Sequence, residues 1–76
     1  MNFLKMKELR ERGWRQSRAT TYRDISEGTF PKPIKIGAAS YWGDSEVDRV
    51  IAAYTRGASE VELKDVVAQI HAERLS

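Results

Sequence analysis

The clearest pattern along the chain is a helical repeat of apolar residues in its second half. Asp44-Ser45 begins one such segment, which Gly57 ends, and Ser59 begins another that continues to about Arg74. Apolar residues recur at i, i+3, i+4 and i+7 in both, which predicts two amphipathic helices joined as a helical hairpin. Ser59 and Glu62 have the spacing of a capping box. The two apolar sets are Val47, Val50, Ile51 and Tyr54, and then Leu63, Val66, Val67 and Ile70.

Between residues 30 and 42 the pattern changes to that of a hairpin. Residues 30–33, Phe-Pro-Lys-Pro, cannot be helical, because each proline favours an extended conformation in the residue before it. Residues 34–36, Ile-Lys-Ile, alternate as a half-buried strand does. We expect residues 37–40 to turn and Tyr41-Trp42 to return as the second strand. Since a lone hairpin is marginal in water, Trp42 and the two isoleucines should pack on the helices.

Two shorter helices are predicted in the first third of the chain. One covers residues 6–12, after a short extended arm at residues 2–5 that turns Phe3 or Leu4 toward a core. The other covers residues 18–27, with Ser17 as its N-cap and Gly28 as its stop. Three residues, Trp14-Arg15-Gln16, join the two helices, and this is the sequence form of a helix-turn-helix.

The second of these helices has few apolar residues to bury. A rotation of 100° per residue brings Thr21, Tyr22 and Ile25 together on its inner face. We therefore expect Trp14 and Phe30 to help hold the helix against the core. The outward positions, available to a partner, are Arg18, Ala19, Thr20 and Arg23.

Composition and charge narrow the class of protein. The chain has 76 residues and no cysteine, which predicts one small domain over residues 1–76 without disulfides or cysteine-metal sites. We see no apolar leader or membrane span and expect a protein of the bacterial cytoplasm, associated with the nucleoid. The net charge of +2 is uneven: residues 1–37 hold nine basic and four acidic residues, residues 38–76 four and seven. A basic half joined to an acidic half favours a polyanion as partner.

Double-stranded DNA is the polyanion that the predicted elements suit. The second helix of a helix-turn-helix can enter the major groove, where arginine pairs with guanine or phosphate. The helix pair alone favours DNA binding no more than it favours a small helical domain whose arginines simply face solvent. A basic hairpin directly after the second helix resembles a wing, and this favours DNA binding. For Lys35 a merely solvated strand face remains the alternative. The candidate DNA-binding residues are Gln16, Ser17, Arg18, Ala19, Thr20, Tyr22, Arg23, Lys32 and Lys35.

Other chemistry has little support. His71 is the only histidine and lacks partners for a metal site, so we expect it to be solvated or to cap a helix. The acidic residues of 44–48 and 60–65 are explained by helix starts, where the helix dipole favours negative charge. We predict no enzyme, no cofactor and no metal. The apolar stripe after Ser59 either covers the preceding helix, which we favour, or meets a partner protein.

Several of these segments together carry a family resemblance. Tyr22-Arg23, then Glu-Gly-Thr-Phe-Pro-Lys-Pro-Ile-Lys-Ile-Gly at residues 27–37, then Tyr41-Trp42 and residues 45–47 resemble the AlpA-type phage regulatory proteins. These proteins are similar to the small excisionases and to the DNA-binding part of MerR-type regulators. The resemblance covers about residues 3–57; the helix over about residues 59–74 lies beyond it, and the wing tip lacks the family's usual basic residue.

The resemblance implies a winged helix-turn-helix encoded by prophages and integrative elements. Its members regulate transcription of integrase or excision genes, or act as excisionases, the recombination directionality factors that bend DNA at attachment sites. We thus expect a mainly α-helical chain with a small β-hairpin that binds double-stranded DNA, with further copies of itself on repeated sites. The alternative is a protein-interaction module that contacts an integrase through the C-terminal helix.

Overall fold

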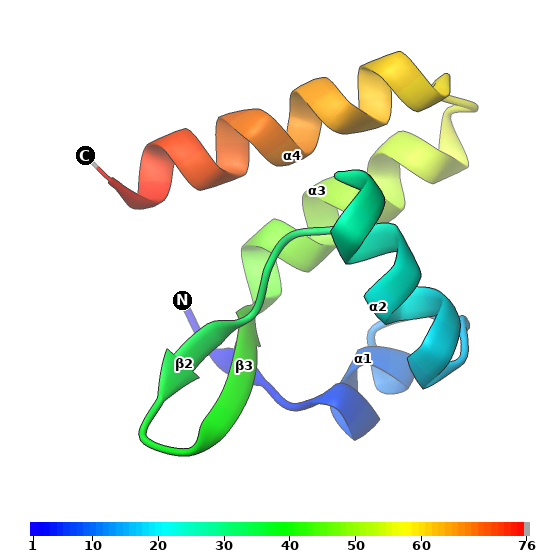
Figure 1. Ribbon diagram of the computed structural model, residues 1–76. Helices are drawn as coiled ribbons and strands as arrows, with labels where there is room; N and C mark the ends of the chain where they lie inside the picture. The colour runs from blue at the N-terminus through cyan, green and yellow to red at the C-terminus, as the bar shows by residue number, and fades with distance from the viewer. Residues whose placement is uncertain (76) are drawn as a thin grey trace.

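The computed structural model describes residues 1–75, in which four helices and three short strands follow one another (Figure 1). The chain is mainly helical with a small antiparallel sheet, which is the winged helix-turn-helix architecture followed by a helical hairpin. This fold class is the one that the sequence predicted. The elements are β1 (Phe3–Leu4), α1 (Met6–Glu11), α2 (Arg18–Glu27), β2 (Ile34–Ile36), β3 (Ala39–Gly43), α3 (Asp44–Thr55) and α4 (Glu60–Arg74).

Helix α2 begins and ends where the sequence indicated. The hydroxyl of Ser17 accepts a hydrogen bond from the backbone N–H of Thr20 at 3.1 Å. Gly28 adopts the left-handed conformation at φ 82°, which a side chain would strain, and the helix stops there. Helix α1 ends at Glu11, and the left-handed Gly13 (φ 107°) then turns the chain toward α2. The Ser17 cap therefore fixes the start of α2, which carries most of the candidate DNA-binding residues.

Aromatic side chains supply the packing that α2 lacks, as expected. The indole of Trp14 stacks on Phe30 with ring centroids 4.5 Å apart. Its Nε1–H donates to the buried hydroxyl of Thr21 at 2.9 Å, and that hydroxyl donates to the carbonyl of Ser17 at 2.8 Å. Tyr22, which we expected to face inward, is 37% exposed instead. Thr21 takes the inward direction, so the next side chain, 100° around the helix, lies at the edge of the buried face.

The sheet has three strands in the order β1-β3-β2, all antiparallel. The sequence predicted the hairpin and an extended arm, but not that the arm pairs with β3, where Leu4 lies opposite Trp42. The expected four-residue turn is also wrong. Ala39 pairs with Ile36, so that only Gly37-Ala38 forms the turn, with Gly37 in the left-handed region at φ 63°.

Trp42 anchors this sheet to the helices. Its side chain is fully buried, and its Nε1–H donates to the carbonyl of Pro31 at 2.8 Å. The expectation that both isoleucines pack inward holds in part for Ile34, which is half-buried, and is wrong for Ile36, which is 48% exposed. The reason is the shape of the molecule: the hairpin projects from the helices (Figure 1), and Ile36 pairs with Ala39 directly beside the turn.

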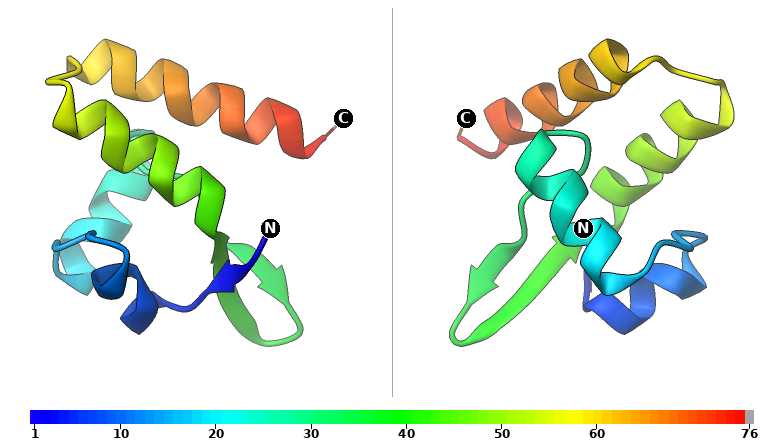
Figure 2. Two further views of the ribbon diagram at one scale, coloured as in Figure 1. Left: turned by 180° about the vertical axis from the view of Figure 1, so that it is seen from behind. Right: turned by 45° about the vertical axis from the view of Figure 1, so that its right-hand side comes forward.

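Helices α3 and α4 lie side by side as an antiparallel hairpin (Figure 2). The apolar stripe of α4 covers that of α3, which confirms the intramolecular interpretation. The buried side chains from the two stripes are Val47, Val50, Leu63, Val67 and Ile70. Tyr54, at the end of the α3 stripe, is partly exposed, with its ring 5.5 Å from that of Trp14. Within residues 1–75, no helix is long and apolar enough to cross a membrane.

Two expectations about α3 and α4 need correction. Glu46 lies in the first turn of α3, as expected, but the helix start is not its whole role, because its side chain is buried and forms an ion pair with Arg74. His71 neither caps a helix nor is simply solvated, because its Nε2 accepts a hydrogen bond from the backbone N–H of Lys32 at 3.0 Å. Both side chains therefore connect segments that lie far apart in the sequence, which helical periodicity alone does not reveal.

Candidate nucleic-acid interface

The first turns of α2 present most of the candidate residues on the surface. Gln16, Ser17, Arg18, Ala19 and Arg23 are exposed, and Thr20 is half-buried. None of the ion pairs in the described structure involves the guanidinium of Arg23. Arg23 can therefore meet a ligand without first breaking an ion pair of the described structure.

The two hydroxyls at the start of α2 are partly occupied. Ser17 caps the helix and also donates its hydroxyl hydrogen to Oγ1 of Thr20 at 3.0 Å. Thr20 accepts that bond, so its own hydroxyl hydrogen remains for an outside acceptor such as a phosphate oxygen. Ser17 is thus mainly structural, whereas Thr20 keeps a donor.

Arg18 and Tyr22 act as a pair on the side of α2 that faces the wing. The guanidinium carbon of Arg18 lies 5.6 Å from the centre of the Tyr22 ring, within the range of a cation–π contact. Both side chains line the hollow between α2 and the hairpin.

A groove of about 410 Å³ separates α2 from the wing. Three cationic side chains line it, from the arm, from α2 and from β2: Lys5, Arg18 and Lys35. No acidic side chain is among its lining residues. Lys35 is held in place there, because its ammonium donates to the hydroxyl of Ser40 on the neighbouring strand at 2.7 Å. The groove therefore concentrates positive charge between the two elements that a winged helix-turn-helix presents to DNA.

Lys5 is a member of this groove that the sequence did not single out. Its ammonium lies 5.9 Å from the centre of the Tyr41 ring on β3. The lysine reaches the groove only because the arm pairs with β3, and a two-residue strand gives no alternation from which to predict that pairing. The only feature of the sequence that could have indicated a role for Lys5 was its position directly after Phe3-Leu4, at the end of the arm.

Lys32 lies apart from the other candidates. It lines a different hollow, together with Glu27, Lys64 and His71, between the end of α2 and α4. The structure thus brings Arg18, Tyr22 and Lys35 together and leaves Lys32 at the corner between α2 and β2. Any phosphate contact by Lys32 would be separate from the groove.

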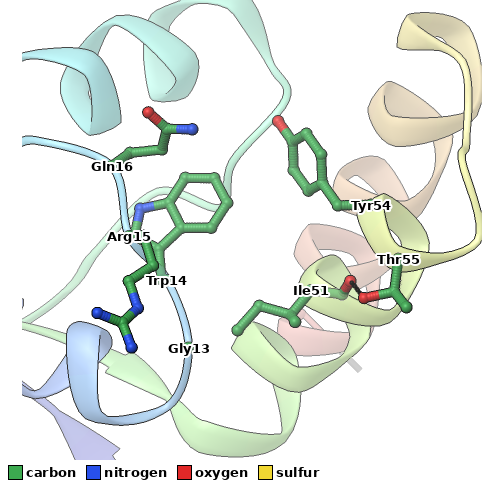
Figure 3. A pocket seen from close by; sticks show the side chains of 7 residues that line it. All are labelled: Gly13, Trp14, Arg15, Gln16, Ile51, Tyr54 and Thr55. Atoms are coloured by element: carbon green, nitrogen blue, oxygen red, sulfur yellow. Dashed lines mark hydrogen bonds between the residues drawn. The ribbon is translucent and has the colours of Figure 1, made fainter.

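A third hollow lies behind the helix-turn-helix turn, where Figure 3 shows the indole of Trp14 facing Ile51 and Tyr54. Apart from Arg15, its lining has no charged side chain. Asp24, on α2, interacts electrostatically with Tyr54; burial raises the pKa of its carboxyl, and the charge of Arg23 opposes that rise.

The fold and the basic groove define a protein of the winged helix-turn-helix class. A protein-family model described as "Prophage CP4-57 regulatory protein (AlpA)" matches residues 2–54, and the chain belongs to this family of phage regulatory proteins. The match confirms the resemblance found in the sequence and extends from β1 nearly to the end of α3; α4 lies outside it. No significant match was found among curated proteins or among solved structures.

Proposed function

We propose that this protein binds double-stranded DNA sequence-specifically, as a transcriptional regulator or an excisionase of a prophage or integrative element. The observation that carries the proposal is the groove between α2 and the wing, with three cations and no acidic lining residue. Family membership supports a regulatory role. Phosphate neutralisation by lysine and arginine supplies essentially all of non-specific DNA binding and a large share of specific binding.

In this proposal α2 enters the major groove with its first turns toward the base edges. Arg23 and Arg18 have the planar fork that pairs with guanine O6 and N7. Lys5 and Lys35, which both line the groove between α2 and the wing, contact phosphates, and the hydroxyl of Thr20 donates to a third phosphate. Gln16 and Ala19 border this surface, while Ser17 holds the backbone N–H groups of α2 in order. A module of this size buries only about 600–1,000 Å² on DNA, so several copies would bind repeated sites.

Selection from a pool of random duplexes tests the proposal. The full chain, immobilised through a C-terminal tag, should enrich one motif over successive rounds. That motif should then bind at least about a thousandfold more tightly than a scrambled duplex of equal length at physiological salt. A pool that stays random, or equal affinity for both duplexes, would overturn sequence-specific recognition.

Regulator and excisionase are distinguished by activity rather than by fold. An excisionase should bend attachment-site DNA and drive excision when mixed with the purified integrase of its own element. A regulator should instead alter transcription from a promoter that carries the selected motif. The alternative was that α4 contacts an integrase through its apolar stripe. That stripe packs against α3 within the molecule, so it does not support this alternative.

A further inference from the structure

The last turns of α4 hold the backbone of Lys32 from both sides. The N–H of Lys32 donates to Nε2 of His71 at 3.0 Å, and its carbonyl accepts from Nη1 of Arg74 at 2.9 Å. His71 and Arg74, three positions apart on α4, therefore bind the backbone N–H and the backbone carbonyl of the same residue, Lys32.

Lys32 lies in the segment that connects α2 to the wing. It stands between Pro31 and Pro33, in the short corner that connects α2 to the wing. Neither proline has a backbone N–H, so Lys32 supplies the only such donor in this tripeptide. The carbonyl of Pro31 is bound in turn by the indole of Trp42. These contacts therefore hold the backbone of the segment that joins α2 to the hairpin.

Arg74 is itself held firmly. Its Nε donates to Oε2 of Glu46 at 2.9 Å and its Nη2 to Oε1 at 2.7 Å, which is the bidentate geometry of a strong pair. Glu46 is 5% exposed. The arginine therefore links α3, α4 and the corner, and its bond to Lys32 is a third contact from a group that is already fixed.

We propose that His71 and Arg74 are positioning residues of the DNA interface, through which α4 sets the angle between α2 and the wing. The proposal rests on the proposed DNA binding and deepens it, because it assigns a role to a helix outside the family match. Neither side chain touches DNA. Each acts on the corner at Lys32 and so on where Lys35 stands relative to Arg18 across the groove.

The hydrogen bond from the N–H of Lys32 requires that Nε2 of His71 be unprotonated. A protonated imidazole has no acceptor nitrogen, and its Nε2–H would face the N–H of Lys32. Burial, followed by the charges of Arg74 and Lys32, lowers the pKa of His71, and only Glu46 opposes this. Glu27 and Lys64 line the same hollow from α2 and α4. Acidification should accordingly release the corner below the ordinary histidine pKa of about 6.5.

The first test uses the free protein, so it does not depend on DNA. His71→Leu removes the acceptor at similar bulk, and Gln69→Ala on the exposed side of α4 is the matched control. Amide exchange of Lys32, measured by NMR, should become at least about tenfold faster in His71→Leu, with increased mobility of residues 34–43, while the control matches the parent. Arg74→Lys, which keeps the charge but loses the fork, should loosen the wing as well. Unchanged exchange at Lys32 in His71→Leu would overturn the proposal.

The second test asks whether His71 acts through the wing on DNA. His71→Leu should weaken binding of the selected duplex by roughly five- to tenfold, and this loss should largely vanish in a Lys35→Ala background. The parent should bind the duplex more weakly at about pH 5.5 than at about pH 7.5, and His71→Leu should lack this pH dependence. A loss that persists in full beside Lys35→Ala would contradict positioning and indicate general destabilisation. Should the parent bind no DNA, the proposed function fails, while the exchange data still decide whether α4 holds the corner.

Discussion

At the scale of single residues, one chain of hydrogen bonds explains how a helix with so few apolar side chains is held in place. Trp14 donates to Thr21, and Thr21 donates to the carbonyl of Ser17, which is also the cap of α2. The threonine can be buried because both functions of its hydroxyl are satisfied. The candidate DNA-binding residues of α2 thus stand on a helix fixed by a polar contact as well as by packing.

Trp14→Phe should therefore destabilise the protein. The change removes the Nε1–H donor and leaves a small cavity beside Phe30, at an expected cost of about 1–3 kcal/mol in the free energy of unfolding. Urea denaturation followed by circular dichroism measures it. Equal midpoints for variant and parent would show that this bond contributes nothing.

Arg23→Ala addresses recognition rather than stability. Since Arg23 is exposed and forms no ion pair among the described residues, its loss should leave the melting temperature unchanged. Affinity for the selected duplex should fall by about 1–3 kcal/mol, with relaxed preference at one base pair. The matched control is Arg56→Ala, an exposed arginine at the end of α3. Equal behaviour of the two variants in a fluorescence anisotropy titration would remove Arg23 from the interface.

At the scale of elements, the sequence predicted helices better than strands, for a physical reason. Ser17 and Gly28 mark the ends of α2 locally, and the i, i+3, i+4, i+7 repeat marks α3 and α4. Strand β1 has only two residues, and its existence depends on β3, some 40 positions later. The exposure of Ile36 and the shortness of the turn at Gly37 likewise depend on where the hairpin ends relative to the helices. The same dependence kept Lys5 out of the predicted interface.

The role of Lys35 in the wing can be tested separately. Lys35→Ala should weaken binding to all sequences alike, because its ammonium is proposed to contact phosphate and reads no base. The slope of log K against log salt should become shallower by about 0.9 for one lost phosphate contact. Titrations of the selected and scrambled duplexes at several salt concentrations measure both effects. Weakening confined to the selected duplex would instead make Lys35 a residue that reads sequence.

At the scale of the whole molecule, α4 closes the structure by covering α3 and gripping the corner before the wing. The sequence predicted the apolar stripe of α4 and its packing against α3, which the structure shows. The contacts of His71 and Arg74 were not, because each pairs a residue on α4 with a backbone group or a buried acid that only the tertiary fold brings near.

The pH dependence of stability follows from one of these contacts. Because the pKa of His71 is lowered in the folded state, by burial first, folding favours the neutral imidazole. Its contribution to stability is complete above about pH 6.5 and is lost as the pH falls through the folded pKa. Glu62, whose pKa is lowered by the N–H of Ser59, loses its contribution only below about pH 4.5. Urea midpoints of the parent should therefore drop between those limits, and His71→Leu should lack that step. A step of equal size in both proteins would assign it to another group.

The central claim is that DNA binds across α2 and the wing, and NMR mapping with the selected duplex tests it most directly. We predict that amide shifts on titration concentrate at residues 16–23 and 34–40 and in the arm at Lys5. The solvent-facing side of α4, around Glu62 and Asp65, should not respond. Shifts centred on α4, with residues 16–23 unaffected, would contradict the account.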